Sequence, residues 1–102
     1  MKFFSLHNES PKVSFQEAVV KGIAPDKGLY FPEDITPLSK DFFKNIERYS
    51  NHEIAFELIK QFVGDEIPEK DLKKIIADTL NFDFPLIEIE DNIFSLELFH
   101  GP

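Results

Sequence analysis

The sequence predicts a single domain of the α+β class, in which an N-terminal strand and a C-terminal hairpin form a small antiparallel or mixed sheet packed with three to four helices. Three observations predict it. Two Ser-x-x-Glu capping boxes mark helix starts, two stretches repeat apolar residues at helical spacing, and the two ends of the chain favour alternation instead. With 102 residues and twelve phenylalanines, the chain can bury one core without disulfides or metal.

The first elements are a strand and a short helix. Residues 2–6 lack helical spacing and are expected to form a strand. Ser14 and Glu17 make the first capping box, in which the hydroxyl and the carboxylate satisfy free backbone amides at a helix start. Gly22 offers the left-handed conformation that ends helices. We therefore expect a helix over residues 15–21.

An extended segment and another short helix follow. Residues 28–32 predict one more short strand, which stops at a proline because proline cannot donate to a ladder. Ser39, with Asp41 in the first turn, can cap a helix. The apolar residues that this helix would carry are Phe42, Phe43 and Ile46.

Two longer helices occupy the middle of the chain. The first opens at the capping box of Ser50 and Glu53 and ends before Gly64. The second has Pro68 at its first helical position and runs to about Leu80. Each carries an apolar stripe that should face the core. The stripes are Ala55, Leu58, Ile59, Phe62 and Val63 in the first helix, and Leu72, Ile75, Ile76 and Leu80 in the second.

The C-terminal region, residues 86–99, predicts a β-hairpin. Its two-residue turn is Asp91-Asn92. A regular ladder from that turn pairs Ile89 with Phe94, and it also pairs Ile87 with Leu96 and Glu88 with Ser95. This register would place the apolar pairs on one side and the polar pair on the other.

Composition excludes several functions. The formal net charge is −8, so nucleic acid and anionic lipid are not expected as partners, since both require Lys and Arg. No apolar run approaches membrane-spanning length. With no cysteine, disulfides, thiolate metal sites and cysteine nucleophiles are excluded, and a reducing cytoplasmic location is expected.

No motif predicts a metal site. His52-Glu53 is similar to the start of the zinc-protease helix motif, but the second histidine of that motif is replaced by Phe56. His7 and His100 have no acidic residue at ligand spacing. We therefore expect that this chain binds no metal.

The acidic pairs favour structural explanations over acid-base chemistry. Asp65-Glu66 is expected to solvate a turn between helices, and Glu88 with Glu90 the wet face of the hairpin, because acidic residues are mostly exposed. Asp26-Lys27-Gly28 is expected to be a turn, since the glycine spacing does not match a phosphate-binding loop.

Three segments resemble a known family. The first comprises Val13-Ser14-Phe15, Ala18-Val19, Gly22, Asp26, Gly28-Leu29 and Pro32. The second is Gly64-Asp65-Glu66-Ile67-Pro68, and the third is Glu97-Leu98-Phe99-His100-Gly101-Pro102. Over nearly its whole length the chain resembles the N-terminal domain of long-form threonine synthases. Ile23, which stands where leucine is usual, is a modest departure. In that family the third segment leads into a threonine and the lysine that binds pyridoxal phosphate.

The resemblance implies a fold-type II pyridoxal-phosphate enzyme that converts O-phosphohomoserine and water to L-threonine and phosphate. Residues 1–102 would be its N-terminal domain, the catalytic domain would follow Pro102, and the chain would contain no catalytic or cofactor-binding residue. His100, Gly101 and Pro102 would lie near the active site. Lys60, Lys73 and Lys74 are expected on solvated helix faces, so none is assigned the cofactor.

Two alternatives stay open at this point. The parent could be a synthase-like phospho-lyase that makes no threonine, or the chain could be a free-standing acidic interaction module. A fragment should expose an apolar patch where its missing domain docks, whereas a complete module should not carry a large orphan patch. The chain ends on an apolar strand and a Gly-Pro turn, so we expect that it breaks off in mid-course.

Overall fold

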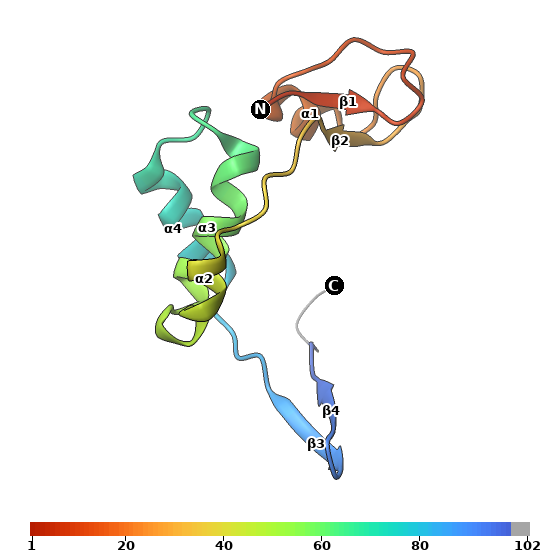
Figure 1. The fold of residues 1–102 in the computed structure, drawn as a ribbon. Coiled ribbons are helices and arrows are strands. Elements are labelled where there is room, and N and C mark those ends of the chain that lie inside the picture. Colours follow the sequence, from red (N-terminus) through yellow and green to blue (C-terminus); the bar gives the residue numbers. More distant parts are fainter. Residues whose placement is uncertain (99–102) are drawn as a thin grey trace.

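A computed structural model describes residues 1–98 of the chain and has four α-helices, a 3-10 helix and four strands in this part (Figure 1). In order they are β1 (Phe3–Ser5), α1 (Phe15–Lys21), β2 (Tyr30–Pro32), α2 (Lys40–Lys44), the 3-10 helix η1 (Ile46–Arg48), α3 (Asn51–Val63), α4 (Glu69–Thr79), β3 (Leu86–Glu90) and β4 (Ile93–Leu96). The strands form two separate antiparallel sheets, β1-β2 and β3-β4. The predicted α+β class is confirmed.

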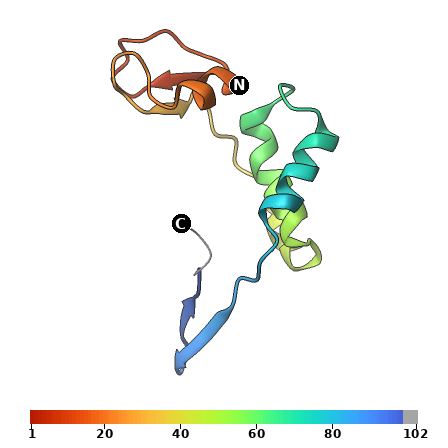
Figure 2. The same cartoon turned by 180° about the vertical axis from the view of Figure 1, so that it is seen from behind.

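The molecule is elongated. Its radius of gyration is 17.0 Å, against about 13 Å for a compact domain of this length. Figures 1 and 2 show three parts in chain order: an N-terminal lobe of β1, α1 and β2, a helical lobe of α2, α3 and α4, and the β3-β4 hairpin, which extends away from the helices. The expectation of one sheet containing both chain ends is therefore wrong, since β1 pairs with β2 alone.

The N-terminal lobe follows the predicted elements closely. Strand β1 pairs with β2 so that Phe4 lies opposite Phe31, and β1 also bridges to Val13. Helix α1 begins after Ser14, whose side chain accepts from the Glu17 amide, and both halves of the capping box are present. The buried residues that form the core of this lobe are Phe3, Val13 and Ala18.

The predicted N-terminal caps of the helical lobe are confirmed. Ser39 accepts a hydrogen bond from the Phe42 amide at the start of α2, and the Ser50 capping box opens α3. Pro68 is the N-cap of α4 and not its first helical residue, because its ψ of 143° is extended. A separate core of Val63, Leu72 and Ile76 joins α3 to α4.

Two expectations about the core are wrong. There are two small clusters instead of one, and Phe15 packs against both. The apolar stripes are only partly buried, because each helix is covered along one strip of its surface. Leu58, Ile59 and Ile75 remain 44%, 41% and 49% exposed.

The hairpin turn is confirmed, but the register beyond it is not. Glu90 pairs with Ile93 around Asp91-Asn92, and a bulge between Glu88 and Glu90 then shifts the ladder by one residue. The resulting pairs are Leu86 with Leu96, Ile87 with Ser95 and Glu88 with Phe94. A regular two-residue hairpin turn of type I′ needs positive φ at both central residues, whereas only Asn92 has it, at 62°.

Among residues 1–98, no helix is long and apolar enough to cross a membrane.

Candidate functional site

The site residues expected from the family resemblance, His100, Gly101 and Pro102, lie outside the described residues. In residues 1–98, no group of three or more His, Asp or Glu side chains is arranged to hold a metal ion. His52 has a structural contact instead. Its Nε2 donates to the carbonyl oxygen of Leu80, 2.8 Å away, and so satisfies an acceptor at the end of α4.

The most connected polar group is Asp26, which joins three loops of the N-terminal lobe. Its Oδ1 accepts from the hydroxyl of buried Ser5 at 2.6 Å and from the amide of Gly28 at 2.9 Å. Its Oδ2 accepts from the amide of Glu9 at 3.0 Å. The backbone amide of Asp26 donates to Ser10 Oγ at 3.1 Å. We call Ser5, Glu9, Ser10, Asp26 and Gly28 the Asp26 clasp.

The chemistry of this carboxylate is structural. The hydrogen bond from the Ser5 hydroxyl, followed by interactions with the Gly28 amide, the Ser10 side chain and the Glu9 amide, lowers the pKa of Asp26 from 3.8 to about 2. A carboxylate with so low a pKa is a poor general base near neutral pH. Gly28 is required beside it, since an added Cβ would lie 2.0 Å from Ser5 Oγ. The clasp therefore holds the lobe together.

The sequence identified only the local half of this clasp. The turn at Asp26-Lys27-Gly28 is confirmed, with the amide of Lys27 donating to the carbonyl of Ala24 at 2.8 Å. The bond from Gly28 to Asp26 spans two residues and is a common signal of Asx turns. The partners Ser5 and Glu9 are 21 and 17 residues away, and no local pattern indicates them.

A second carboxylate, Glu66, ties the two lobes together. Its two oxygens accept from the backbone amides of Phe15 and Gln16 at 3.0 and 2.9 Å, at the first turn of α1. The bond from Gln16, followed by that from Phe15, lowers the pKa of Glu66 below its ordinary value. The expectation that Asp65-Glu66 only solvates a turn is therefore wrong for Glu66, because it satisfies amides that helix α1 leaves free.

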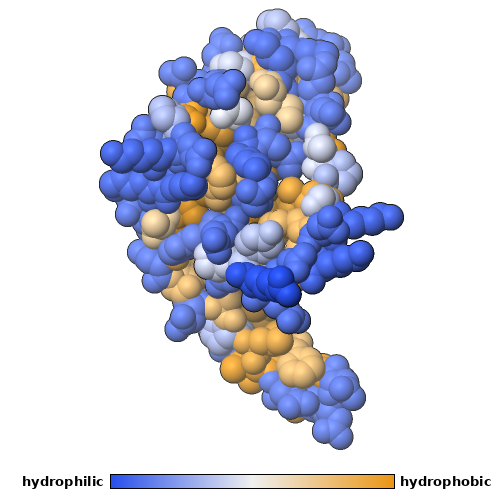
Figure 3. All heavy atoms as spheres, turned by 60° about the vertical axis from the view of Figure 1, so that its left-hand side comes forward, coloured by the Kyte–Doolittle hydropathy of each residue, from blue (hydrophilic) through white to orange (hydrophobic). Residues whose placement is uncertain are grey.

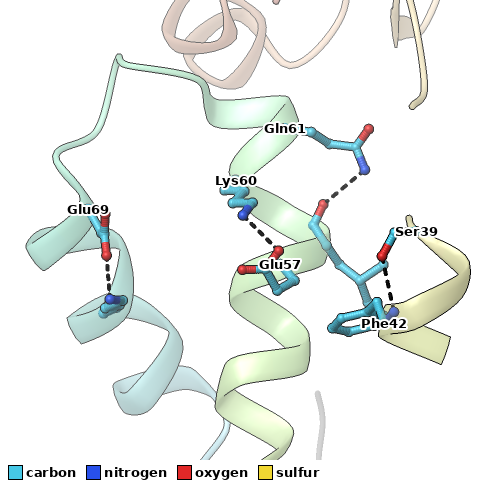
Figure 4. A network of polar contacts seen from close by, with 8 residues as sticks. Ser39, Phe42, Glu57, Lys60, Gln61 and Glu69 are labelled. Atoms are coloured by element: carbon cyan, nitrogen blue, oxygen red, sulfur yellow. Dashed lines mark hydrogen bonds and ion pairs between the residues drawn. The ribbon is translucent and has the colours of Figure 1, made fainter. Parts of the chain in front are cut away.

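Three lysines of the helical lobe, Lys60, Lys73 and Lys74, are paired with carboxylates. Figure 4 shows Lys60 beside Glu57, with 2.7 Å between Nζ and Oε2, and an ion pair at Glu69, which Lys73 makes one turn away. Lys60 and Lys73 also lie 5.7 and 4.9 Å from the centre of the Phe56 ring. Both side chains are about half exposed, as expected for a solvated face.

The same close-up shows a polar contact within α3 and the cap of α2 (Figure 4). Gln61 donates from its Nε2 to the carbonyl of Leu58 at 3.4 Å. Its Oε1 accepts from the Thr36 amide at 3.0 Å, which joins α3 to the segment before α2. Ser39 caps α2 through the Phe42 amide. These contacts are all made within the chain.

Exposed apolar surface is the more informative feature. The accessible surface is 8101 Å², about 2,200 Å² more than a compact monomer of the same mass exposes. Figure 3 shows apolar residues running down one face towards the hairpin end of the molecule. In residues 86–98, the large apolar side chains that are more than 40% exposed are Leu86, Ile87, Ile89, Ile93, Phe94, Leu96 and Leu98. A surface of this kind is typical of a docking interface.

Comparison with known proteins agrees with this geometry. Residues 2–80 match the family model described as threonine synthase N terminus. The chain is 31% identical over 102 residues to threonine synthase of Escherichia coli K12, covering all of this chain and 24% of that protein. The chain thus spans about a quarter of the length of the curated relatives it matches.

Solved structures share the fold. The crystal structure of Escherichia coli threonine synthase superposes with a TM-score of 0.89 at 31% identity, covering 99% of this chain and 24% of that one. A structure of threonine synthase from Brucella melitensis, described as PLP bound, gives 0.89 at 34% identity and covers 100% and 23%. The arrangement of lobes and hairpin is therefore that of the corresponding part of those enzymes.

Proposed function

We propose, from the premise that this chain belongs to the threonine synthase N-terminus family, that it is the N-terminal domain of a threonine synthase. The whole enzyme would convert O-phosphohomoserine and water to L-threonine and phosphate, a carbon-oxygen lyase reaction of threonine biosynthesis. The observation that carries the proposal is the likeness to threonine synthases over the full chain, in sequence and in fold.

The proposal assigns catalysis to the polypeptide that follows Pro102. Pyridoxal phosphate, when bound, supplies an electron sink for reactions at amino-acid carbons and is held covalently by a lysine amine. We infer that none of the ten lysines of this chain holds that group, since all ten are exposed to solvent and Lys60, Lys73 and Lys74 are paired with Glu57, Glu69 and Asp78. We therefore propose that residues 1–102 bind no cofactor and are inactive alone.

The role of the chain would be to dock on the catalytic domain. The exposed apolar surface supports this role over that of a free-standing acidic module. The net charge of −8 supports a partner that is neither nucleic acid nor membrane, and the lack of cysteine supports a cytoplasmic location.

The segment His100-Gly101-Pro102 is proposed, by resemblance, to lie near the active site of the whole enzyme. If His100 contacts substrate or the adjoining loop, His100→Ala in the full-length protein should lower turnover by on the order of a hundredfold while changing the melting temperature little. Equal turnover in the variant and the parent would make the segment a structural turn only.

The experiment that tests the function compares the full-length protein with residues 1–102. With pyridoxal phosphate and O-phosphohomoserine, the full-length protein should release phosphate and form threonine in equal amounts, and the 102-residue chain should do neither. Phosphate release without threonine would identify a synthase-like phospho-lyase. Neither product from a folded, cofactor-loaded full-length protein would refute the proposal.

A further inference from the structure

The β3-β4 hairpin is apolar on both of its faces. Cross-strand partners share a face, so Leu86, Phe94 and Leu96 lie on one face together with Glu88. The other face holds Ile87 and Ile93, beside Ser95 and Glu90. We call these face one and face two. Their apolar side chains are 62%, 51% and 54% exposed on face one, and 44% and 54% exposed on face two.

The bulge at Ile89 produces this distribution. In a regular ladder the two apolar pairs, Ile89 with Phe94 and Ile87 with Leu96, would share one side, and the side with Glu88 and Ser95 could face water. The one-residue shift between Glu88 and Glu90 places Phe94 on the same face as Glu88, and Ile93 on the same face as Ile87. The unshifted ladder would place each of these two residues on the other face. Neither face is then a polar, solvent-facing one.

A hairpin with two exposed apolar faces requires a cover on each. A lone two-stranded sheet is marginally stable in water, and strands with apolar residues on both sides are those buried on both sides. Neither strand belongs to the two buried clusters of the chain, and the hairpin points away from the helices (Figure 2).

Charge and length indicate what the cover is. Residues 86–98 contain four acidic residues and no lysine or arginine, so a second copy of the hairpin would bring carboxylates against carboxylates. A different surface with basic residues avoids this repulsion. The chain spans 24% of its relative from Escherichia coli, so the remaining three quarters of such a protein would be covalently attached at high effective concentration.

We propose that residues 86–98 are an interior strand pair of the assembled protein, covered on face one and face two by the polypeptide that follows Pro102, with basic side chains of that polypeptide opposite Glu88 and Glu90. This inference rests on the proposed function, since it requires a following domain. The alternative arrangement is a hairpin that lies on the surface of that domain, with one face covered and the other in contact with water.

Thiol labelling of the full-length protein tests the proposal, and because residues 1–102 contain no cysteine, a cysteine introduced there is the only thiol among them. Leu96→Cys reports on face one and Ile87→Cys on face two. Lys74→Cys, on the outer side of α4, is the matched control because its side chain is 74% exposed. Alkylation of each peptide, measured by mass spectrometry in native and urea-unfolded protein, gives a protection factor.

Both hairpin thiols should be protected by at least about a hundredfold, and the Lys74→Cys thiol should react at nearly its unfolded rate. Protection on one face alone, or on neither, would overturn the proposal. Protection that disappears on dilution would identify a second copy as the cover and would overturn it too.

Hydrogen exchange tests the same proposal on the unmodified protein, so its result does not depend on whether a cysteine variant folds. Hydrogen exchange of the unmodified full-length protein should show slow amides in β3 and β4, whereas an uncovered hairpin opens at almost no free-energy cost. The proposed function is judged separately. Slow exchange and two protected faces in a protein that forms no threonine would refute that function and leave this inference standing.

Discussion

Two adjacent isoleucines of α4 have opposite environments and give a sharp test of the helical lobe. Ile76 is 7% exposed and belongs to the cluster with Val63 and Leu72, whereas Ile75 is 49% exposed. Ile76→Ala removes three buried carbons, which is worth about 2.4 kcal/mol at about 0.8 kcal/mol each. The cavity left between α3 and α4 adds to this loss, so the free energy of unfolding should fall by about 2 to 5 kcal/mol.

Ile75→Ala is the matched control. The same three carbons are removed, but half of that surface is already in water, and alanine has the higher helix propensity. The expected loss is below about 1 kcal/mol. Urea denaturation of residues 1–102 followed by circular dichroism measures both losses, and an unchanged dependence on urea concentration would show that only stability differs. Equal losses for Ile75→Ala and Ile76→Ala would refute the assignment of faces on α4.

Four further predictions follow from the polar contacts. Gly28→Ala should lower the free energy of unfolding by more than about 2 kcal/mol, because its Cβ would clash with Ser5 Oγ. Gly22 has a φ of 69° and open space around it, so Gly22→Ala should lower the same quantity by about 1 to 2 kcal/mol in thermal or urea unfolding. Because the pKa of Asp26 is about 2 instead of 3.8, the folded state binds this proton less readily than the unfolded state. The stability that the clasp contributes is therefore full above about pH 4 and is lost as the pH falls towards 2. Asp26→Asn should flatten that part of an acid titration of the free energy of unfolding. Glu66, whose pKa is also lowered, should likewise lose its tie to α1 in acid, and Glu66→Gln should lower the melting temperature more at pH 7 than at pH 3. Lys74→Ala should cost under about 0.5 kcal/mol, because its pair with Asp78 is exposed; a larger loss in urea unfolding would contradict this.

The helix boundaries were predictable from the sequence because their causes are local. The Ser14 and Ser50 caps bond amides three residues away, and the helices end at Gly22 and Gly64 as expected. The Asp91-Asn92 turn is local in the same sense. Pro68 was misplaced by one position, since a proline suits both the N-cap and the first helical residue and the sequence does not say which.

The candidate site was much less predictable. The residues assigned by family resemblance, His100, Gly101 and Pro102, lie outside the described part, and their role stays a prediction. The contacts of Asp26 with Ser5, Glu9 and Ser10, and the tie from Glu66 to α1, join groups 16 to 51 residues apart. No periodicity or short motif indicates such partners, because they are brought together only when the loops have folded.

What the sequence alone determined is which residues form helices and strands and, in the helices, which residues share an apolar face. Caps, turns and periodicity act within a few residues, so they do not depend on the rest of the fold. Only the tertiary structure decided what covers each face. Leu58 lies on the same apolar stripe as Val63 but is 44% exposed, since helix α4 covers only part of that stripe. The bulge beside Ile89 likewise decided that both faces of the hairpin are apolar, because a shift of one residue moves side chains to the opposite face.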